Sequence, residues 1–363
     1  MPDWTKSMEQ TYEFYKVNPN TWRETEPIRT ITSCTVTRDS SQETLGSASL
    51  NCTEDLGECY VRVYLVTRQN RIKERFCLGT FLTQTPEFNY DGKTSDISID
   101  CYTPLLELKD VPPPLGYTVF KGIKTLNAAF DIVRENCRAP LGRVSGYDGL
   151  DHVLTQDFVS DTDDTWLSYT TDLISNAGYQ FALEDDCSIY FDKIKDLKTM
   201  QPMYTFSDNN SSLLGPSIKD KRDLYGIPNV LEMLFTSDTN DYYYAVVENN
   251  DPNSEVSIQR RGRRVVKRET KPNFPGNPTK EEFDEYAIQT LKDLSTLEHT
   301  VTFTHGFVPK VRLGTCVRLN YTRAGLTNIR ARITSQSIKC GTGCMVDATA
   351  TYTTELWDGT VVN

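Results

Sequence analysis

The stretch YTFSDNNSSLLGPSIKDKRDLYGIPNVLEM, residues 204–233, divides the chain into two halves. Its polar run SDNNSS, residues 207–212, ends the preceding element because short polar side chains compete for backbone hydrogen bonds. Glycines and prolines then interrupt a charged segment, after which NVLEMLF at 229–235 alternates like a half-buried strand. We therefore predict a connector at 206–223 and a second β-rich region after it.

The size and composition of the chain bound its class. It has 363 residues, of which 38% are hydrophobic, 10% aromatic and 25% charged. This balance is typical of a folded protein, and at roughly 100 to 200 residues per domain the length suggests about two to four domains. No window approaches the roughly 20 apolar residues that cross a bilayer, and the start lacks the apolar core of a signal peptide. We expect no membrane insertion and synthesis in the cytoplasm.

The formal net charge is −11. A general nucleic-acid binder needs a basic face that displaces counterions from phosphates, so this charge argues against that class. An acidic wall would let DNA slide past without specific binding, although an acidic balance is also ordinary among soluble proteins.

The first half is mainly β. Residues 1–20 hold four aromatic side chains with no clear period, which we interpret as an arm that docks on a neighbour or on the chain itself. Period-two alternation and short turns predict an antiparallel barrel or sandwich over 21–110. Its expected strands are 31–38, 46–52, 59–67, 71–83 and 94–103.

An insert follows, because the three prolines of VPPPL at 111–115 cannot continue a sheet. Helical spacing of apolar residues predicts helices at 123–137 and around Trp166, and a hairpin then closes an α/β domain at 111–205. The acidic triplet at 184–186 between the hairpin strands suggests a cation site or a solvated turn, and without calcium-loop spacing we favour the turn.

The second half, 224–357, repeats the β pattern and ends in a short tail at 358–363. A capping box at Thr279 and Glu282 and a single apolar stripe predict a helix at 280–297. The expected strands are 229–236, 242–248, 300–307, 316–321, 329–338 and 345–352.

A basic cluster precedes that helix. Its members are Arg260, Arg261, Arg263, Arg264, Lys267 and Arg268. Contact with DNA and contact with an acidic protein both fit, but the cluster lacks interleaved aromatic residues. We favour a protein partner interface at Arg260, Arg261, Arg263 and Arg264.

Ten cysteines raise the question of disulfides and metals. Cys52 and Cys59 lie on apolar faces of consecutive predicted strands and could form a cross-strand disulfide. Cys340 and Cys344 flank a glycine-containing turn, with Cys316 on a strand of the same predicted barrel, but a closed metal site generally needs a fourth ligand. We predict no metal, with Cys340 and Cys344 free or linked to each other.

Catalytic signatures were sought in the sequence. There is no nucleophile elbow, zinc-binding HExxH, phosphate-binding loop or dinucleotide fingerprint. We predict that the protein is not an enzyme and has no cofactor. The alternative is a β-rich cell-wall hydrolase or peptidase.

Several short patterns carry a family resemblance. They are Trp166-Leu167, NAGY at 176–179, IYF at 189–191, SDN at 207–209, PNV at 228–230, the region 22–39 and IKCGTGCM at 338–345. In spacing and turn residues the chain resembles the hub proteins of bacteriophage tails, which form the ring between the tail tube and the central spike.

The resemblance implies an α+β, mainly β protein with two tail-tube-like antiparallel β-barrels, 21–110 and 224–357, and the insert between them. It also implies a homotrimer, whose six barrels match a six-fold tube to a three-fold spike. The expected partners are tail tube or tube-initiator proteins and the central spike protein, with DNA passing through the lumen. The expected location is the virion, at the tail tip or baseplate.

Overall fold

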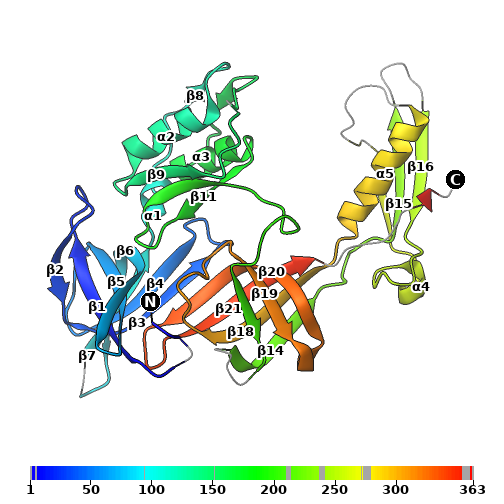
Figure 1. Ribbon diagram of the computed structural model, residues 1–363. Helices are drawn as coiled ribbons and strands as arrows, with labels where there is room; N and C mark the ends of the chain where they lie inside the picture. The colour runs from blue at the N-terminus through cyan, green and yellow to red at the C-terminus, as the bar shows by residue number, and fades with distance from the viewer. Residues whose placement is uncertain are drawn as a thin grey trace. The chain divides into compact units, whose positions relative to one another are not determined.

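The computed structural model describes every residue except 1, 5, 94, 151, 210–213, 237–241, 271, 273–278, 354–359 and 362–363 (Figure 1). The chain forms two compact units. Unit 1 is Met1–Ile218 with Thr302–Ala350, and unit 2 is Lys219–Val301 with Thr351–Asn363.

A 13-stranded sheet is the main feature of the fold. Its strands run in the order β14-β18-β21-β20-β3-β4-β7-β6-β5-β1-β2, and β13 joins through β19, which pairs with β20. The strands of the first half are β1 (Glu9–Val17), β2 (Glu24–Ile28), β3 (Ile31–Asp39), β4 (Gly46–Cys52), β5 (Tyr60–Gln69), β6 (Ile72–Tyr90) and β7 (Ser95–Tyr102). The later strands are β13 (Tyr204–Ser207), β14 (Leu214–Arg222), β18 (Glu298–Gly306), β19 (Cys316–Tyr321), β20 (Leu326–Lys339) and β21 (Met345–Thr353).

The pairing of β3 with β20 joins the two halves of the sequence. Val36 lies opposite Ile338 in antiparallel register, and both side chains are fully buried in one apolar cluster. That cluster also takes in Leu50, Val63 and Ile99 from the first half. Within the described residues, strands from both predicted barrels thus share one sheet and one core, and the two-barrel arrangement stays a prediction.

The predicted arm is mostly a strand. Residues Glu9–Val17 pair with β5 along their whole length as β1. Ahead of β1, the Trp4 ring lies 5.3 Å from that of Phe76 and 5.6 Å from that of Phe307. The N-terminal segment thus docks on its own chain.

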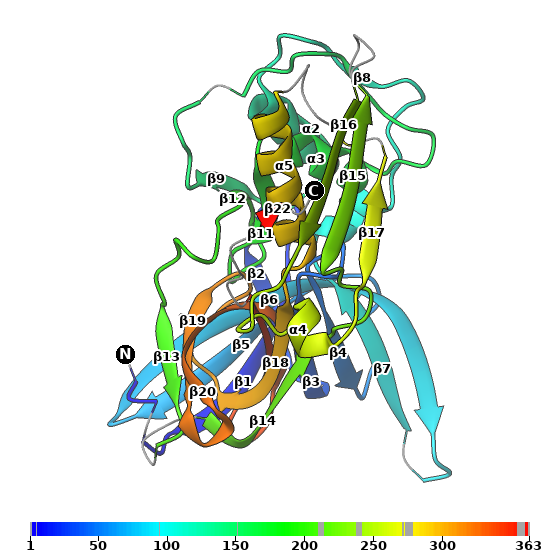
Figure 2. The same ribbon diagram turned by 90° about the vertical axis from the view of Figure 1, so that its right-hand side faces the viewer.

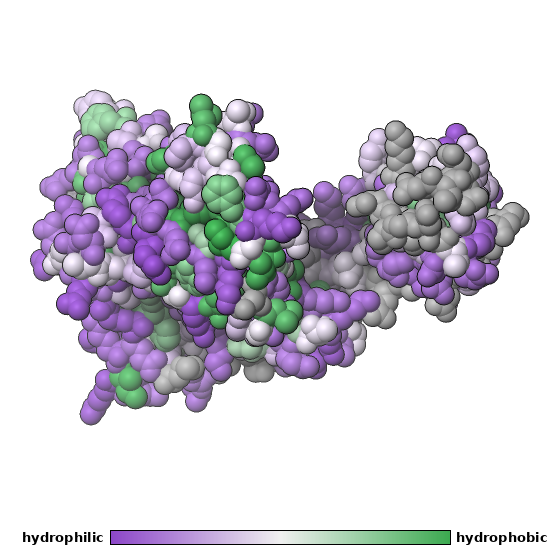
Figure 3. All heavy atoms as spheres, turned by 90° about the horizontal axis from the view of Figure 1, so that it is seen from above, coloured by the Kyte–Doolittle hydropathy of each residue, from purple (hydrophilic) through white to green (hydrophobic). Residues whose placement is uncertain are grey.

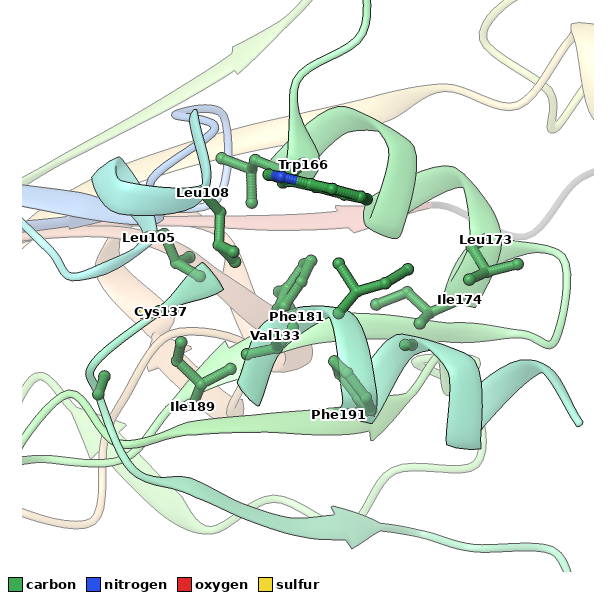
Figure 4. Close-up of a cluster of buried hydrophobic side chains, with 14 of the residues drawn as sticks. Leu105, Leu108, Val133, Cys137, Trp166, Leu173, Ile174, Phe181, Ile189 and Phe191 are labelled. Carbon is green, nitrogen blue, oxygen red and sulfur yellow. The ribbon is translucent and has the colours of Figure 1, made fainter. Parts of the chain in front are cut away.

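The insert packs around an apolar core that it shares with the large sheet, which contributes Val17, Tyr60 and Leu82 (Figure 4). The predicted helices are confirmed as α2 (Thr125–Asn136) and α3 (Trp166–Ser175), and the hairpin as β11 (Tyr179–Leu183) and β12 (Ile189–Lys193). Trp166, Phe181 and Phe191 are buried in this core together with residues of the short helix α1 (Leu105–Lys109). The small strands β8 (Thr118–Val119), β9 (Leu141–Ser145) and β10 (Phe158–Val159) complete the domain.

Unit 2 contains a four-stranded sheet in the order β17-β15-β16-β22. These strands are β15 (Val230–Thr236), β16 (Tyr242–Glu248), β17 (Val266–Glu269) and β22 (Thr360–Val361), and α4 (Ile258–Arg261) precedes β17. The helix α5 (Lys280–Leu294) begins with the predicted capping box and covers one face of this sheet (Figure 2).

Two sequence expectations need correction. The stretch predicted as a connector at 206–223 contains the end of β13 and all of β14, which belong to the large sheet. Pro216 is compatible with β14 because that strand lies at the edge of the sheet, where a missing donor costs little. The region predicted as a second barrel is also divided, since β15 to β17 and α5 lie in unit 2 while β19 and β20 lie in unit 1.

Candidate assembly surfaces and reactive groups

The predicted basic interface lies on α4 and the loop that leads to β17. Ser257 caps α4 by accepting a hydrogen bond from the Arg260 backbone amide, and Gly262 ends the helix with a left-handed φ of 63°. The helix is therefore a single turn, which projects arginines from a compact corner of unit 2.

Two of the four predicted interface arginines bind groups within unit 2. Arg261 donates to the carbonyl oxygens of Ile227 (2.6 Å) and Leu224 (2.5 Å), and so holds the turn at 223–227. Arg264 pairs with Glu248 at 2.7 Å. The structure thus divides this predicted set by partner: Arg261 and Arg264 have partners within unit 2, whereas no ion pair is recorded among the described residues for the exposed Arg260 and Arg263.

The acidic turn at 184–186 is neither a cation site nor a simple solvated turn. Arg312 donates to Asp185 at 2.6 Å, and the guanidinium of Arg38 lies 3.8 Å from the same carboxylate. Trp22 donates its indole N–H to the Asp186 carbonyl oxygen at 3.2 Å. The hairpin tip of the insert is therefore an ionic contact with the large sheet, within unit 1.

Burial acts on both members of this contact. It lowers the pKa of Arg38 and raises the pKa of Asp185, while the charge of Arg38 acts to lower the pKa of Asp185. Arg38 also donates to the Leu78 carbonyl oxygen at 3.0 Å. The guanidinium is thus satisfied by backbone and carboxylate together, as a buried charge requires.

All ten cysteines are free thiols in the structure, including Cys52, Cys59, Cys340 and Cys344. Burial raises the pKa of Cys52 to about 11 and that of Cys344 to about 12. The thiolate is the reactive form of cysteine, so these two side chains act as small apolar core residues.

The backbone of Cys340 donates to the carbonyl oxygen of Cys34 at 3.0 Å, across the pairing of β20 with β3. Cys340 and Cys344 pack in the core cluster shared by both halves of the sequence, and Cys316, on β19, is not a member of it. Among the described residues no group of three or more His, Cys, Asp or Glu side chains could hold a metal ion.

The structure forms one histidine cluster that the sequence did not reveal. His299 is buried, and its Nδ1 lies 3.0 Å from an oxygen of Asp220 and 2.9 Å from the hydroxyl of Tyr352. Asp220 is 79 residues away in sequence, which is why inspection of neighbouring positions missed it. No serine or cysteine nucleophile is recorded in contact with His299 within the described part of the chain.

A polar groove lies over β3, β4 and β7, with a volume of about 440 Å³. Thr35, Thr37, Ser47, Ser49 and Asp100 line it, along with other residues that include neither histidine nor cysteine. Its charged lining residues are Glu43, Asp100 and Lys109, of which Glu43 and Lys109 form an ion pair at 2.6 Å.

Among the described residues no helix is both long enough and apolar enough to cross a membrane. Hydrophilic side chains cover most of the face shown in Figure 3, with apolar residues between them. The insert exposes several large apolar side chains, among them Leu115 and Phe120.

Comparison with solved structures identifies the fold. No sequence-defined family matches this chain, and no curated protein matches it. A tail protein from Neisseria meningitidis MC58 superposes with a TM-score of 0.63 at 13% identity, over 94% of this chain and 96% of that one. A 43 kDa tail protein of prophage MuSo2 from Shewanella oneidensis gives 0.60 at 11% identity, over 94% and 98%.

A third solved structure is also similar in fold. A chain of the Francisella PdpA–VgrG complex gives a TM-score of 0.55 at 10% identity, covering all of this chain and 55% of that one. This protein therefore has the fold of phage tail proteins, which confirms the resemblance to such proteins seen in the sequence.

Proposed function

We propose that this chain is the structural hub of a phage tail baseplate. In this role it forms a ring that joins the tail tube to the central spike and lines part of the DNA channel, and it is not an enzyme. The observation that carries the proposal is the match to tail proteins over nearly the full length of both partners, 94% and 96% for the first. A shared domain alone would not give that mutual coverage.

The large sheet supports a ring. In the described part of this sheet, β2, β13 and β14 each pair with a single strand, and an open sheet can continue into a neighbour through unpaired backbone groups. The proposed assembly is a homotrimer at the tail tip of the virion, assembled in the host cytoplasm. Its partners are the tail tube or tube-initiator proteins on one side and the central spike protein on the other.

The charge supports a channel role. A net charge of −11 on each subunit gives an assembled ring a strongly acidic balance, so that DNA is repelled from the wall and passes without specific binding. Measured affinity for duplex DNA should therefore be negligible at moderate salt.

The decisive experiment is a mass measurement of the purified full chain by light scattering, followed by electron microscopy of the particles. We expect three times the chain mass of 41.3 kDa and three-fold rings with a central opening. A monomer at all concentrations, or particles without a central opening, would contradict the hub.

The second candidate function is a tail-borne cell-wall hydrolase. The observation that favours it is the His299, Asp220 and Tyr352 cluster, since a histidine held by a carboxylate is a common general base. Release of soluble fragments from purified peptidoglycan, lost in His299→Ala, would support this candidate. We expect no release, in keeping with the buried position of His299.

A further inference from the structure

We propose that one surface of unit 2 binds a second copy of this chain. The surface comprises the corner formed by α4 and the face of the four-stranded sheet that α5 leaves uncovered. This inference rests on the proposed function, because a hub subunit must contact its neighbours in the ring.

The uncovered face exposes apolar and aromatic side chains as well as charged ones. Alternation along β15 and β16 buries Leu231 and Ala245 under α5 and directs the alternate residues to the opposite face. On that face Tyr244 is 51% exposed and Leu234 36%, and Val266 on the edge strand β17 is 44% exposed. A sheet with one face in water usually carries polar residues there, so this composition points to an interface.

The charged groups on the same face are already paired. Arg268 donates to Glu232 at 2.6 Å, and Arg264 pairs with Glu248 at 2.7 Å. A partner that covers this face therefore meets ion pairs whose charges are balanced, together with exposed apolar and aromatic side chains.

The α4 corner, which precedes β17 in the chain, presents an exposed aromatic side chain of its own. Tyr225 is 94% exposed, at the tip of the turn that Arg261 holds by two hydrogen bonds. Asp223 closes the same turn by accepting a hydrogen bond from the Tyr225 amide at 2.8 Å. A tyrosine on a pinned turn can be buried by a partner with little further loss of backbone entropy.

Two cations complete the corner. Arg260 and Arg263 are exposed, and no ion pair is recorded for either among the described residues. Tyrosine and arginine are the residues in which binding energy concentrates at protein interfaces. The corner therefore offers an aromatic anchor and two uncompensated charges that favour an acidic partner.

Charge identifies the occupant as another copy of the chain. The basic cluster at 260–268 holds six cations, so the rest of each subunit carries −11 − 6 = −17. A neighbouring subunit thus carries an acidic balance that complements the two cations of this corner. DNA is also acidic, and it is distinguished from a second copy in the experiment below.

The experiment measures self-association of the full chain by sedimentation velocity. Charge reversal in the double variant Arg260→Glu with Arg263→Glu should weaken association at least tenfold, and Tyr225→Ala should weaken it in the same direction. The matched control is Lys121→Glu with Arg134→Glu, two exposed cations of the insert, which should leave association unchanged. Circular dichroism melting verifies that each variant is folded.

The outcomes separate this inference from the hub itself. If the wild type and the charge-reversed variant assemble equally well, the proposed surface is not the interface, whereas the proposed hub function is unaffected. If the wild type is monomeric throughout, both fail. Binding of a duplex DNA probe at 150 mM NaCl that is lost in the charge-reversed variant would overturn the inference in favour of nucleic acid.

Discussion

Two short charged stretches of this chain are neutralised to different extents by the fold. The acidic turn at 184–186 is neutralised inside unit 1 by Arg38 and Arg312, which come from distant parts of the sequence. The basic stretch at 260–268 is only partly neutralised in unit 2, where Arg260 and Arg263 remain exposed. The difference shows that the role of a charge run depends on which partners the fold brings to it.

We expect the largest loss of stability from a variant that breaks the buried ionic contact of the acidic turn. Replacing Arg38 by Met removes the cation from Asp185 and the hydrogen bond to the Leu78 carbonyl. Loss of one partner of a buried pair costs about 3 kcal/mol, so the melting transition of unit 1 should shift downward by several degrees. Calorimetry of the full chain measures this shift.

Arg312→Met is the matched comparison for that variant, because the Arg312 side chain is 40% exposed against 15% for Arg38. Its effect should be smaller. Equal shifts for the two variants would mean that burial does not set the strength of the contact.

The second prediction concerns the stability of unit 1 at acidic pH. His305 in unit 1 is fully buried against Phe206 and Phe303, and burial lowers its pKa to about 4. The unfolded chain takes up this proton near pH 6.5, before the folded chain does, so acid favours unfolding. Above pH 6.5 His305 is neutral in both states and does not lower the free energy of unfolding. Between pH 6.5 and pH 4 its protonation in the unfolded chain lowers the free energy of unfolding by up to about 3 kcal/mol.

The measurement is the free energy or midpoint of unit 1 unfolding as a function of pH, with His305→Phe as the control. Phenylalanine does not titrate and suits the aromatic surroundings, so its profile should be flatter between pH 6.5 and 4. Parallel profiles for the two proteins would assign the acid sensitivity to other groups.

The third prediction tests the internal part of the basic stretch. Arg261→Ala removes two hydrogen bonds to the turn at 223–227 and should destabilise it locally by about 1–2 kcal/mol. Amide hydrogen exchange in that turn should accelerate roughly tenfold, while Arg260→Ala should leave it unchanged. Equal exchange in both variants would show that Arg261 does not hold the turn.

The smallest effect is expected for Arg268→Ala. The Arg268 side chain is 76% exposed, and an exposed ion pair such as the one with Glu232 contributes less than about 1 kcal/mol. Chemical denaturation should give a midpoint close to that of the wild type. A loss comparable to that of Arg38→Met would remove the distinction between the two charged stretches.

Much of the local structure could be predicted from the sequence. Period-two alternation marked strands such as β4, and the capping box at Thr279 marked the start of α5. These signals depend on residues close together in the chain. The edge strand β14 was missed because a strand exposed at a sheet edge carries little apolar alternation and tolerates Pro216.

The candidate site was predicted only in part. The sequence identified the basic cluster, but Tyr225, which lies outside it, emerged only from its exposure and from the pinning of its turn. The contact between His299 and Asp220 was likewise invisible, because the two residues are 79 positions apart. The α4 corner and the His299 cluster could therefore be identified only in the folded chain.

The sequence by itself determined the β-rich composition, the α/β insert, most of the element boundaries and the likeness to phage tail hubs. Only the tertiary structure decided that strands of both halves join through β3 and β20 and that Arg38 meets Asp185. The physical reason is that alternation and capping report which face of an element is buried. Strand pairing and ion pairing instead depend on contacts between residues far apart in the chain, which local periodicity does not encode.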